Sequence, residues 1–349
     1  MLSKRFFYDG KAVLPLNNIQ LKYKKQIENK IKTKKYIFES ISCIVCDSNN
    51  FEKLAEKDRY GLPMNVVICK TCGLIQTNPR MNFDSYNEFY NEEYRKLYEG
   101  SDNVANEFVK QYNRGKLIYN YIKKITGNSL TNKFVVEIGT GAGGVLKFFE
   151  EQENKILGID VDSSYISYGK KKGLNLEVGT IEKILEFNIK ADLVIFSHTF
   201  EHFLNPIHEL QRVKKILKEK SLVYIEVPGI RNLTTAYNQD FLRYLQNAHT
   251  FHFTLTSLKN CCMKSGFRLV SGDEFIRSLF RIDAIKNNFV SDYEPSIKFL
   301  KKIEKTRLNP LNQFIIKKKI FPFIIMLLEK TKTKKIAKKF IGDQFSSNR

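Results

Sequence analysis

The stretch VEIGTGAGGVLKFF, residues 136–149, decides the fold class of this 349-residue chain. It continues an apolar run that begins at Phe134, and its four glycines stand at 139, 141, 143 and 144. Apolar residues at 145, 148 and 149 then have the spacing of one helix face. A short apolar strand, a glycine-rich turn and an amphipathic helix are typical of the first unit of an alternating β/α chain.

The same alternation continues downstream. Apolar strands are predicted at 155–159, 192–196 and 221–227, and helices at 163–172 and from Pro206 onward. This pattern predicts an α/β fold, with a Rossmann-like, mostly parallel sheet and helices on both faces. Ligands of such sheets bind beyond the carboxyl ends of the strands.

Two acidic residues narrow the ligand of the glycine loop. The glycines alone also fit the G-x-G-x-x-G fingerprint of dinucleotide sites. Glu137, two residues before the loop, disfavours a pyrophosphate and suits a cationic ligand. Asp160 ends the second strand, where a carboxylate can accept both hydroxyls of a ribose. S-Adenosylmethionine has a ribose, an amino group and a sulfonium but no phosphate, and its predicted binding residues are Glu137, Gly139, Gly141, Gly143 and Asp160.

Four of the six cysteines form a metal-binding pattern. Two residues separate Cys43 from Cys46 and Cys69 from Cys72, with 22 residues between the pairs. Each pair lets a tight turn direct two thiolates at one ion about 2.3 Å away, and two pairs complete a tetrahedron. We predict a structural Zn²⁺ site, with a redox dithiol or four unrelated buried cysteines as the alternatives.

These motifs resemble those of class I S-adenosylmethionine-dependent methyltransferases over residues 134–270: VEIGTGAGG as the glycine loop, GIDVD as the ribose-binding strand end, and ADLVIFSHTFEHFLNP and YIEVP as later strands with their loops. Upstream, CIVC, CKTCGLIQTNPR and YNEFYNEEYRKLY resemble the zinc-binding N-terminal module of bacterial sugar methyltransferases. The resemblance implies methyl transfer to a sugar, a sugar-nucleotide or a lipid-linked glycan in surface polysaccharide biosynthesis. In sugar C-methyltransferases a Glu-His pair follows the fifth strand, but this chain has Ala248-His249, so carbon is not assigned as the methylated atom.

The resemblance also implies roles for residues in the loops at the carboxyl edge of the sheet. It places Glu201 and His202 opposite the acceptor, and aligns His249 with the histidine base of the sugar enzymes. A histidine titrating near neutrality suits removal of a hydroxyl proton, so these three are the predicted catalytic residues. The alternative is that the histidines only position loops. Further cofactor contacts are implied for Thr180, Ile181 and His198.

Tyr86, Tyr90, Tyr94 and Tyr98 recur every four residues, which places them on one helix face. They are predicted either to roof the acceptor pocket or to pack against the cysteine module.

The net charge of +21 is concentrated at the two ends of the chain. Residues 1–40 carry 10 Lys/Arg against 3 Asp/Glu, and residues 296–349 carry 15 against 3, which leaves 33 against 31 between them. The charge therefore bears little on the reaction. Residues 320–328 are apolar and flanked by lysines, as in a helix that lies on an anionic membrane, although solvated faces of packed helices would give the same pattern.

The chain is expected to be cytoplasmic, with this C-terminal region as the candidate for peripheral membrane contact. Its nine-residue apolar stretch is far shorter than the roughly 20 residues of a membrane-spanning helix. Five domains are predicted: 1–40, a basic N-terminal extension; 41–82, the zinc-binding module; 83–130, a helical linker or lid; 131–275, the S-adenosylmethionine domain; and 276–349, a basic helical C-terminal region.

Two other functions fit the same sequence. An rRNA or tRNA methyltransferase would use the basic ends for phosphate contacts, but the neutral body disfavours nucleic acid as the partner. An inactive S-adenosylmethionine-binding module is disfavoured because Glu137, the glycines and Asp160 are all present.

Overall fold

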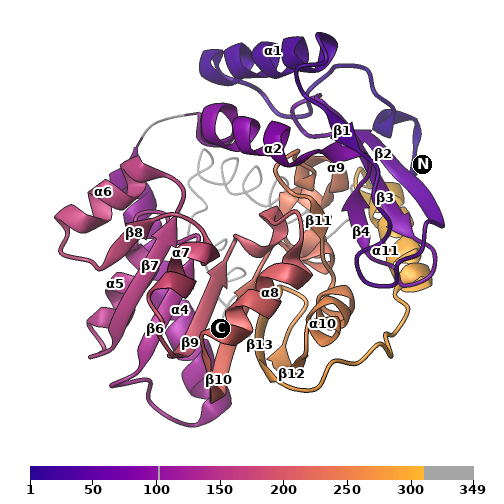
Figure 1. Cartoon of the computed structure of the whole chain (residues 1–349). Helices are drawn as coiled ribbons and strands as arrows, with labels where there is room; N and C mark the ends of the chain where they lie inside the picture. Colours follow the sequence, from indigo (N-terminus) through magenta and orange to yellow (C-terminus); the bar gives the residue numbers. More distant parts are fainter. Residues whose placement is uncertain (101–102, 310–349) are drawn as a thin grey trace, which may run out of the picture.

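A seven-stranded sheet forms the centre of the computed structural model, which describes residues 1–100 and 103–309 (Figure 1). Its strand order is β12-β13-β10-β9-β6-β7-β8. The strands are β6 (Phe134–Ile138), β7 (Lys155–Asp160), β8 (Leu176–Val178), β9 (Ala191–Ser197), β10 (Leu217–Glu226), β12 (Phe267–Gly272) and β13 (Arg277–Ile282).

Five neighbouring strands of this sheet, β8, β7, β6, β9 and β10, are parallel, which confirms the predicted fold class. β13 runs antiparallel to both β10 and β12. The predicted boundary at residue 275 is therefore wrong, because residues 277–282 complete the sheet and do not begin a helical tail. Three consecutive residues of β13 are fully buried: Ser278, Leu279 and Phe280. Consecutive residues of a strand point to opposite faces, so both faces of β13 are covered.

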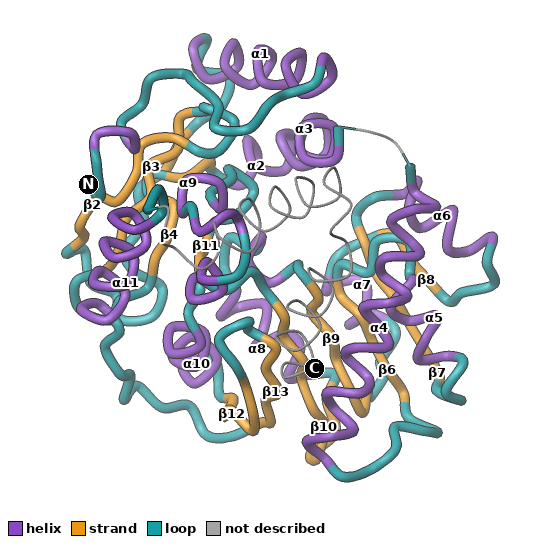
Figure 2. Tube along the Cα trace, turned by 180° about the vertical axis from the view of Figure 1, so that it is seen from behind, coloured by secondary structure: helices purple, strands orange, loops and turns teal. Residues whose placement is uncertain are grey.

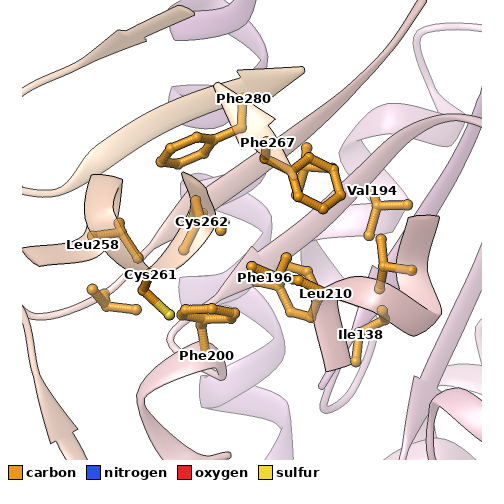
Figure 3. Close-up of a cluster of buried hydrophobic side chains, with 14 of the residues drawn as sticks. Ile138, Val194, Phe196, Phe200, Leu210, Leu258, Cys261, Cys262, Phe267 and Phe280 are labelled. Carbon is orange, nitrogen blue, oxygen red and sulfur yellow. The ribbon is translucent and has the colours of Figure 1, made fainter. Parts of the chain in front are cut away.

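Helices cover both faces of the sheet, as the alternation predicted. On one face, α4 and α5 bury Ile118 and Phe149 against Ile195. On the other, α8 and α10 bury Leu210 and Leu258 against Phe196, in the cluster drawn in Figure 3. Cys261 and Cys262 lie in this second cluster, are fully buried and act as small core residues. The helices around the sheet are α4 (Val104–Thr126), α5 (Gly144–Glu150), α6 (Ser163–Lys171), α7 (Ile181–Glu186), α8 (Pro206–Lys215) and α10 (Leu255–Lys264).

A second, antiparallel sheet contains the N-terminal strands, in the order β11-β4-β3-β2. Three of its strands are consecutive: β2 (Phe51–Lys57), β3 (Pro63–Cys69) and β4 (Ile75–Thr77). The fourth, β11 (Phe251–His252), comes from the predicted S-adenosylmethionine domain and pairs with β4. A short ribbon pairs β1 (Phe38–Glu39) with β5 (Arg80–Met81).

The N-terminal residues and α11 (Tyr293–Thr306) also pack on this second sheet. Phe6, near the N-terminus, and Leu300 of α11 share a buried cluster with Leu54 of β2. In Figure 2, α11 lies beside the N-terminal strands. The remaining helices are α1 (Asn18–Lys32), α2 (Phe83–Phe89), α3 (Arg95–Glu99) and α9 (Phe241–Tyr244), with short turns η1 (Lys4–Phe6), η2 (Tyr90–Tyr94), η3 (Phe200–His202), η4 (Ile230–Thr234) and η5 (Tyr237–Gln239).

Residues 310–349, on which the prediction of membrane contact rests, lie outside the described residues. Across the part of the chain that the structure does describe, no helix is both long and apolar enough to span a bilayer.

Candidate active site

The glycine-rich loop joins β6 to α5 at the carboxyl edge of the central sheet. Gly139, Gly141 and Gly143 have φ angles of 74°, 55° and 83°, which side chains disfavour. A Cβ atom on Gly139 would lie 2.2 Å from Thr199 Oγ1, and one on Gly141 would lie 2.4 Å from Gln111 Nε2. At Gly143 the nearest atoms belong to leucines of the sheet core. Gly143 thus serves packing, whereas the other two let neighbouring polar groups approach the turn.

Asp160, at the end of β7, holds the loop in place. Its Oδ2 accepts the N–H of Gly141 at 2.8 Å, and its Oδ1 accepts the N–H of Asp162 at 2.9 Å. Each carboxylate oxygen keeps a second lone pair, so both can still accept a ribose hydroxyl. A cavity of about 550 Å³ opens beside Asp162, and its lining includes Tyr90, Arg95 and Tyr165.

Glu137 lies on β6 directly under the loop and is only 2% exposed. The hydroxyl of Thr140 donates to its Oε2 at 2.7 Å. Burial raises the pKa of Glu137 to about 8, against the opposing effects of the Thr140 hydrogen bond and the charge of Arg114. A cation that bound here would favour the ionised carboxylate.

Arg114, on α4, is a site residue that the sequence analysis missed. Burial raises the pKa of Glu137, Glu201 and Glu226, and the charge of Arg114 opposes that rise in all three. Gln111, one turn earlier, accepts the N–H of Gly144 at 3.2 Å. Residues 104–126 therefore form a layer on the sheet that contacts the loop, and do not form the predicted linker or lid. Gln111 and Arg114 are three residues apart, so they lie on the same face of the helix. This spacing of two polar residues is the pattern that could have indicated their shared position at the site.

A turn after β9 brings His198 between two carboxyl groups. His198 has a φ of 55°, and its side chain is 35% exposed. Its Nδ1 lies 3.8 Å from Glu201 Oε1, and its Nε2 lies 3.8 Å from Glu226 Oε1. The hydroxyl of Thr199 donates to the carbonyl of Gly139 at 3.4 Å. The turn thus connects the glycine loop with the buried groups beyond it.

Glu201, His202 and His249 form a buried group, hereafter the acid–histidine cluster. Their exposed fractions are 2%, 7% and 3%. Nε2 of each histidine lies 3.8 Å from Glu201 Oε1. The N–H of Thr250 donates to the Glu201 carbonyl at 3.0 Å, which fastens the loop carrying His249 to η3. The structure therefore brings together the three residues predicted to be catalytic.

Burial sets the protonation of this cluster. It raises the pKa of Glu201 to about 8, lowers that of His202 to about 4, and holds that of His249 well below its usual value. Both histidines are neutral at pH 7, and their low pKa values make each a weak base on its own.

The tyrosines lie in two different environments. Rings of Tyr90 and Tyr94 stack at 4.7 Å, and their centroids lie 5.7 Å and 5.4 Å from that of His202. Both belong to η2, a π-helical turn, and such turns recur at functional sites. Tyr86 donates its hydroxyl to the carbonyl of Ala248 at 2.8 Å and packs with the N-terminal segment. Tyr90 and Tyr94 thus cover the acid–histidine cluster, whereas Tyr86 is a packing residue.

Thr180 and Ile181, for which further cofactor contacts were implied, are placed differently from each other. Thr180 caps α7 and is exposed, with its hydroxyl bonded to Glu182. Ile181 is 2% exposed, and its side chain packs in the sheet core.

The four cysteines predicted to bind zinc converge away from the glycine loop. Their Sγ atoms all lie within 4.8 Å of one another, and the Cys43–Cys72 and Cys46–Cys69 sulfur pairs are 3.4 Å apart. Four thiolates at about 2.3 Å from a tetrahedral ion would lie roughly 3.8 Å apart, so the donor set fits Zn²⁺.

Comparison with known proteins finds one matching family and several distant relatives. Residues 110–272 match the model of a family described as a methyltransferase domain. Ribosomal RNA small subunit methyltransferase A of Aster yellows witches'-broom phytoplasma (strain AYWB) and that of Onion yellows phytoplasma (strain OY-M) are each 24% identical to this chain over 224 residues, which is 58% of this chain and 80% of the relative. A solved TehB-like SAM-dependent methyltransferase of Corynebacterium glutamicum is 15% identical, with a TM-score of 0.37, over 58% of this chain and 100% of that chain.

Proposed function

We propose that residues 110–272, which match a methyltransferase domain, use S-adenosylmethionine, and that this chain methylates a hydroxyl group of a sugar or sugar-nucleotide in surface polysaccharide synthesis. One observation carries the proposal: the turn after β9 connects the loop held by Asp160 with a buried cluster of one carboxyl and two imidazoles. A methyl donor and a hydroxyl acceptor need such adjoining sites, since alignment supplies much of the catalysis.

The cofactor would be held by the residues around the glycine loop. Asp160 accepts the ribose hydroxyls, and Glu137 with the backbone of Gly139 and Gly141 surrounds the amino acid part. Arg114 supplies a cation for its carboxylate. The remaining part of the cofactor would lie beside Thr180, the backbone of Ile181, and His198. Bound S-adenosylmethionine supplies an electrophilic methyl group.

The acid–histidine cluster would handle the acceptor proton. His249 and His202 present neutral imidazoles, and Glu201, with a pKa near 8, can exchange a proton close to neutral pH. Tyr90 and Tyr94 add aromatic faces of the kind that pack against sugar rings. The four-cysteine site, with Zn²⁺, would stabilise the second sheet and does no chemistry, because four thiolates leave no open position.

The cofactor site is tested by Asp160→Asn. Replacement of one carboxylate oxygen by an amide sets an N–H against a backbone N–H and removes an acceptor for ribose. We expect S-adenosylhomocysteine, measured by calorimetry, to bind at least about tenfold more weakly, equal to about 1.4 kcal/mol. The exposed Asp84→Asn is the control. Wild-type affinity in folded Asp160→Asn protein would remove this residue from the site.

The acceptor is tested by transfer of a labelled methyl group. Purified protein is offered a panel of nucleotide sugars and, in parallel, small-subunit ribosomal RNA. Label in the sugar fraction that disappears in His249→Ala supports the proposal, and label in RNA alone refutes it.

RNA is the second candidate because the relatives named above are ribosomal RNA methyltransferases and both chain ends are basic. The near-neutral charge of residues 41–295 favours the sugar.

A further inference from the structure

The acid–histidine cluster contains more unpaired polar atoms than a buried site normally leaves. Both carboxyl oxygens of Glu201 lack a hydrogen-bond partner within the described chain, and Oε1 is the oxygen nearest to Nε2 of His202 and of His249. Buried polar atoms are almost always paired, and each unpaired group costs about 1–3 kcal/mol. These three residues come from two separate segments, η3 and the loop before β11, so the convergence is a product of the fold.

The distances inside the cluster are too long for hydrogen bonds. Glu201 Oε1 lies 3.8 Å from Nε2 of His202, from Nε2 of His249 and from Nδ1 of His198. Donors that share one ion at about 2.1 Å lie roughly 3–3.6 Å apart. The two carboxylate–imidazole distances are therefore within a few tenths of an ångström of the spacing of donors that share a cation, and the three ligand atoms all lie within 4.8 Å of one another.

Neighbouring side chains prepare His249 as a ligand. Arg59 donates to Gln246 Oε1, which directs the Gln246 amide N–H at His249 Nε2. An amide N–H can only donate, so Nε2 carries the lone pair. An ion bound at Nε2 would take the place of this amide, while Arg59 keeps Gln246 beside the ring.

From this geometry we infer a second metal site, in which Glu201, His202 and His249 bind a divalent first-row transition ion. Two imidazoles and one carboxylate are a donor set for Mn²⁺, Fe²⁺, Co²⁺ or Zn²⁺. Three protein ligands leave coordination positions open, unlike the four-cysteine site. His198, whose side chain is a third exposed, lies equally close to Glu201 and directly precedes Thr199, which hydrogen-bonds to the glycine loop.

The role of the ion rests on the proposed function. An acceptor hydroxyl that binds at an open position loses its proton more easily and is held in line with the methyl donor. With the ion bound, Glu201 and the two histidines would be occupied as ligands, so the acceptor proton would pass to water and not to the cluster. The hydroxyl oxygen would bond to the methyl carbon as the carbon–sulfur bond breaks, with its electron pair passing to sulfur. The products are a methyl ether and S-adenosylhomocysteine.

The test is a metal titration of the full chain after removal of loosely bound ions. Mn²⁺ is the ion used, because it prefers nitrogen and oxygen ligands and should not bind the four-cysteine site. Its binding is followed by electron paramagnetic resonance. A parallel Zn²⁺ titration reports both sites. We expect one Mn²⁺ per wild-type chain and at least about tenfold weaker binding in Glu201→Gln and in His249→Ala. His208→Ala, an exposed histidine on α8, should bind like the wild type.

Two results would overturn the inference: no Mn²⁺ binding together with only one Zn²⁺ per chain, or equal affinity in Glu201→Gln and wild type. Circular dichroism and thermal melting establish that each variant is folded. Calorimetry with S-adenosylhomocysteine separates the two proposals. If S-adenosylhomocysteine binds but the second ion does not, only the inferred metal site is refuted. If the ion binds but S-adenosylhomocysteine does not, the proposed function is refuted.

Discussion

At the scale of single residues, the site contains glutamate side chains that are buried in the ligand-free protein. Glu137 and Glu201 are each 2% exposed, and burial raises the pKa of each to about 8. Ionised carboxylates in such places are costly unless a cation joins them. An ammonium or metal cation is therefore the partner that these acids suit.

This burial predicts how stability depends on pH in the ligand-free protein. The pKa of Glu137 is higher in the folded state than its usual 4.5, so the folded state binds more protons between the two values. Its contribution is fully present below about pH 4.5 and is lost as pH rises through 8. We expect the free energy of unfolding to fall by about 1 kcal/mol per pH unit from this group over that range.

Urea denaturation at pH 5, 6, 7 and 8 measures this slope. Glu137→Gln removes one titrating group and should make the slope shallower by about 1 kcal/mol per pH unit, leaving the part that comes from Glu201, whereas Glu219→Gln, on the exposed part of β10, should leave the slope unchanged. Identical slopes in Glu137→Gln and wild type would show that Glu137 is not the source.

At the scale of elements, close packing of α4 on α5 places Gln111 and Arg114 at the loop. Gly115 makes this approach possible, since a Cβ there would lie 2.7 Å from the Val145 carbonyl and 3.0 Å from Phe148 Cβ. Any larger residue pushes the two helices apart.

Gly115→Val should therefore destabilise the protein by about 1–3 kcal/mol and weaken the binding of S-adenosylhomocysteine. Chemical denaturation and calorimetry measure the two effects. Leu117→Ala, at a position 64% exposed on the same helix, should change neither by much. Unchanged affinity in a destabilised Gly115→Val protein would mean that α4 does not position the loop.

The sequence predicted the elements whose pattern is local. The strand and glycine turn at 134–144, Asp160 at the next strand end and the two cysteine pairs each follow from short-range spacing. The sequence did not reveal β13, because a strand buried on both faces lacks the alternation of apolar and polar residues. It did not reveal Arg114 either, because the carboxyl groups that its charge affects come from three distant elements, β6, η3 and β10. The cluster of Glu201 with His249 depends on a contact across 48 residues, which no local pattern encodes.

At the scale of the whole molecule, the four-cysteine site and the central sheet share one core. Cys43, Cys69 and Cys72 pack in the same buried cluster as Phe251 and Leu258. The Asp292 N–H, just before α11, donates to the Cys72 carbonyl at 3.0 Å. Loss of the metal is therefore expected to affect the stability of the entire chain.

Cys69→Ser should remove the structural Zn²⁺ and lower the free energy of unfolding by several kcal/mol, since structural zinc sites contribute about 10 kcal/mol or more of binding free energy. Metal analysis and thermal melting measure this. Thr71→Ala, which changes an exposed residue between the paired cysteines, is the matched control. A Cys69→Ser protein that keeps its zinc and its melting temperature would refute the site.

The pairing of β11 with β4 also has a consequence for synthesis. Residues 78–250 separate the two strands, and a ribosome that adds about 5–20 residues per second needs on the order of 10–30 s to make them. Throughout that interval β4 presents an unpaired backbone edge, and α11, which covers the same sheet, emerges later still. The nascent N-terminal half is thus open to wrong pairing until the last third of the chain has left the ribosome.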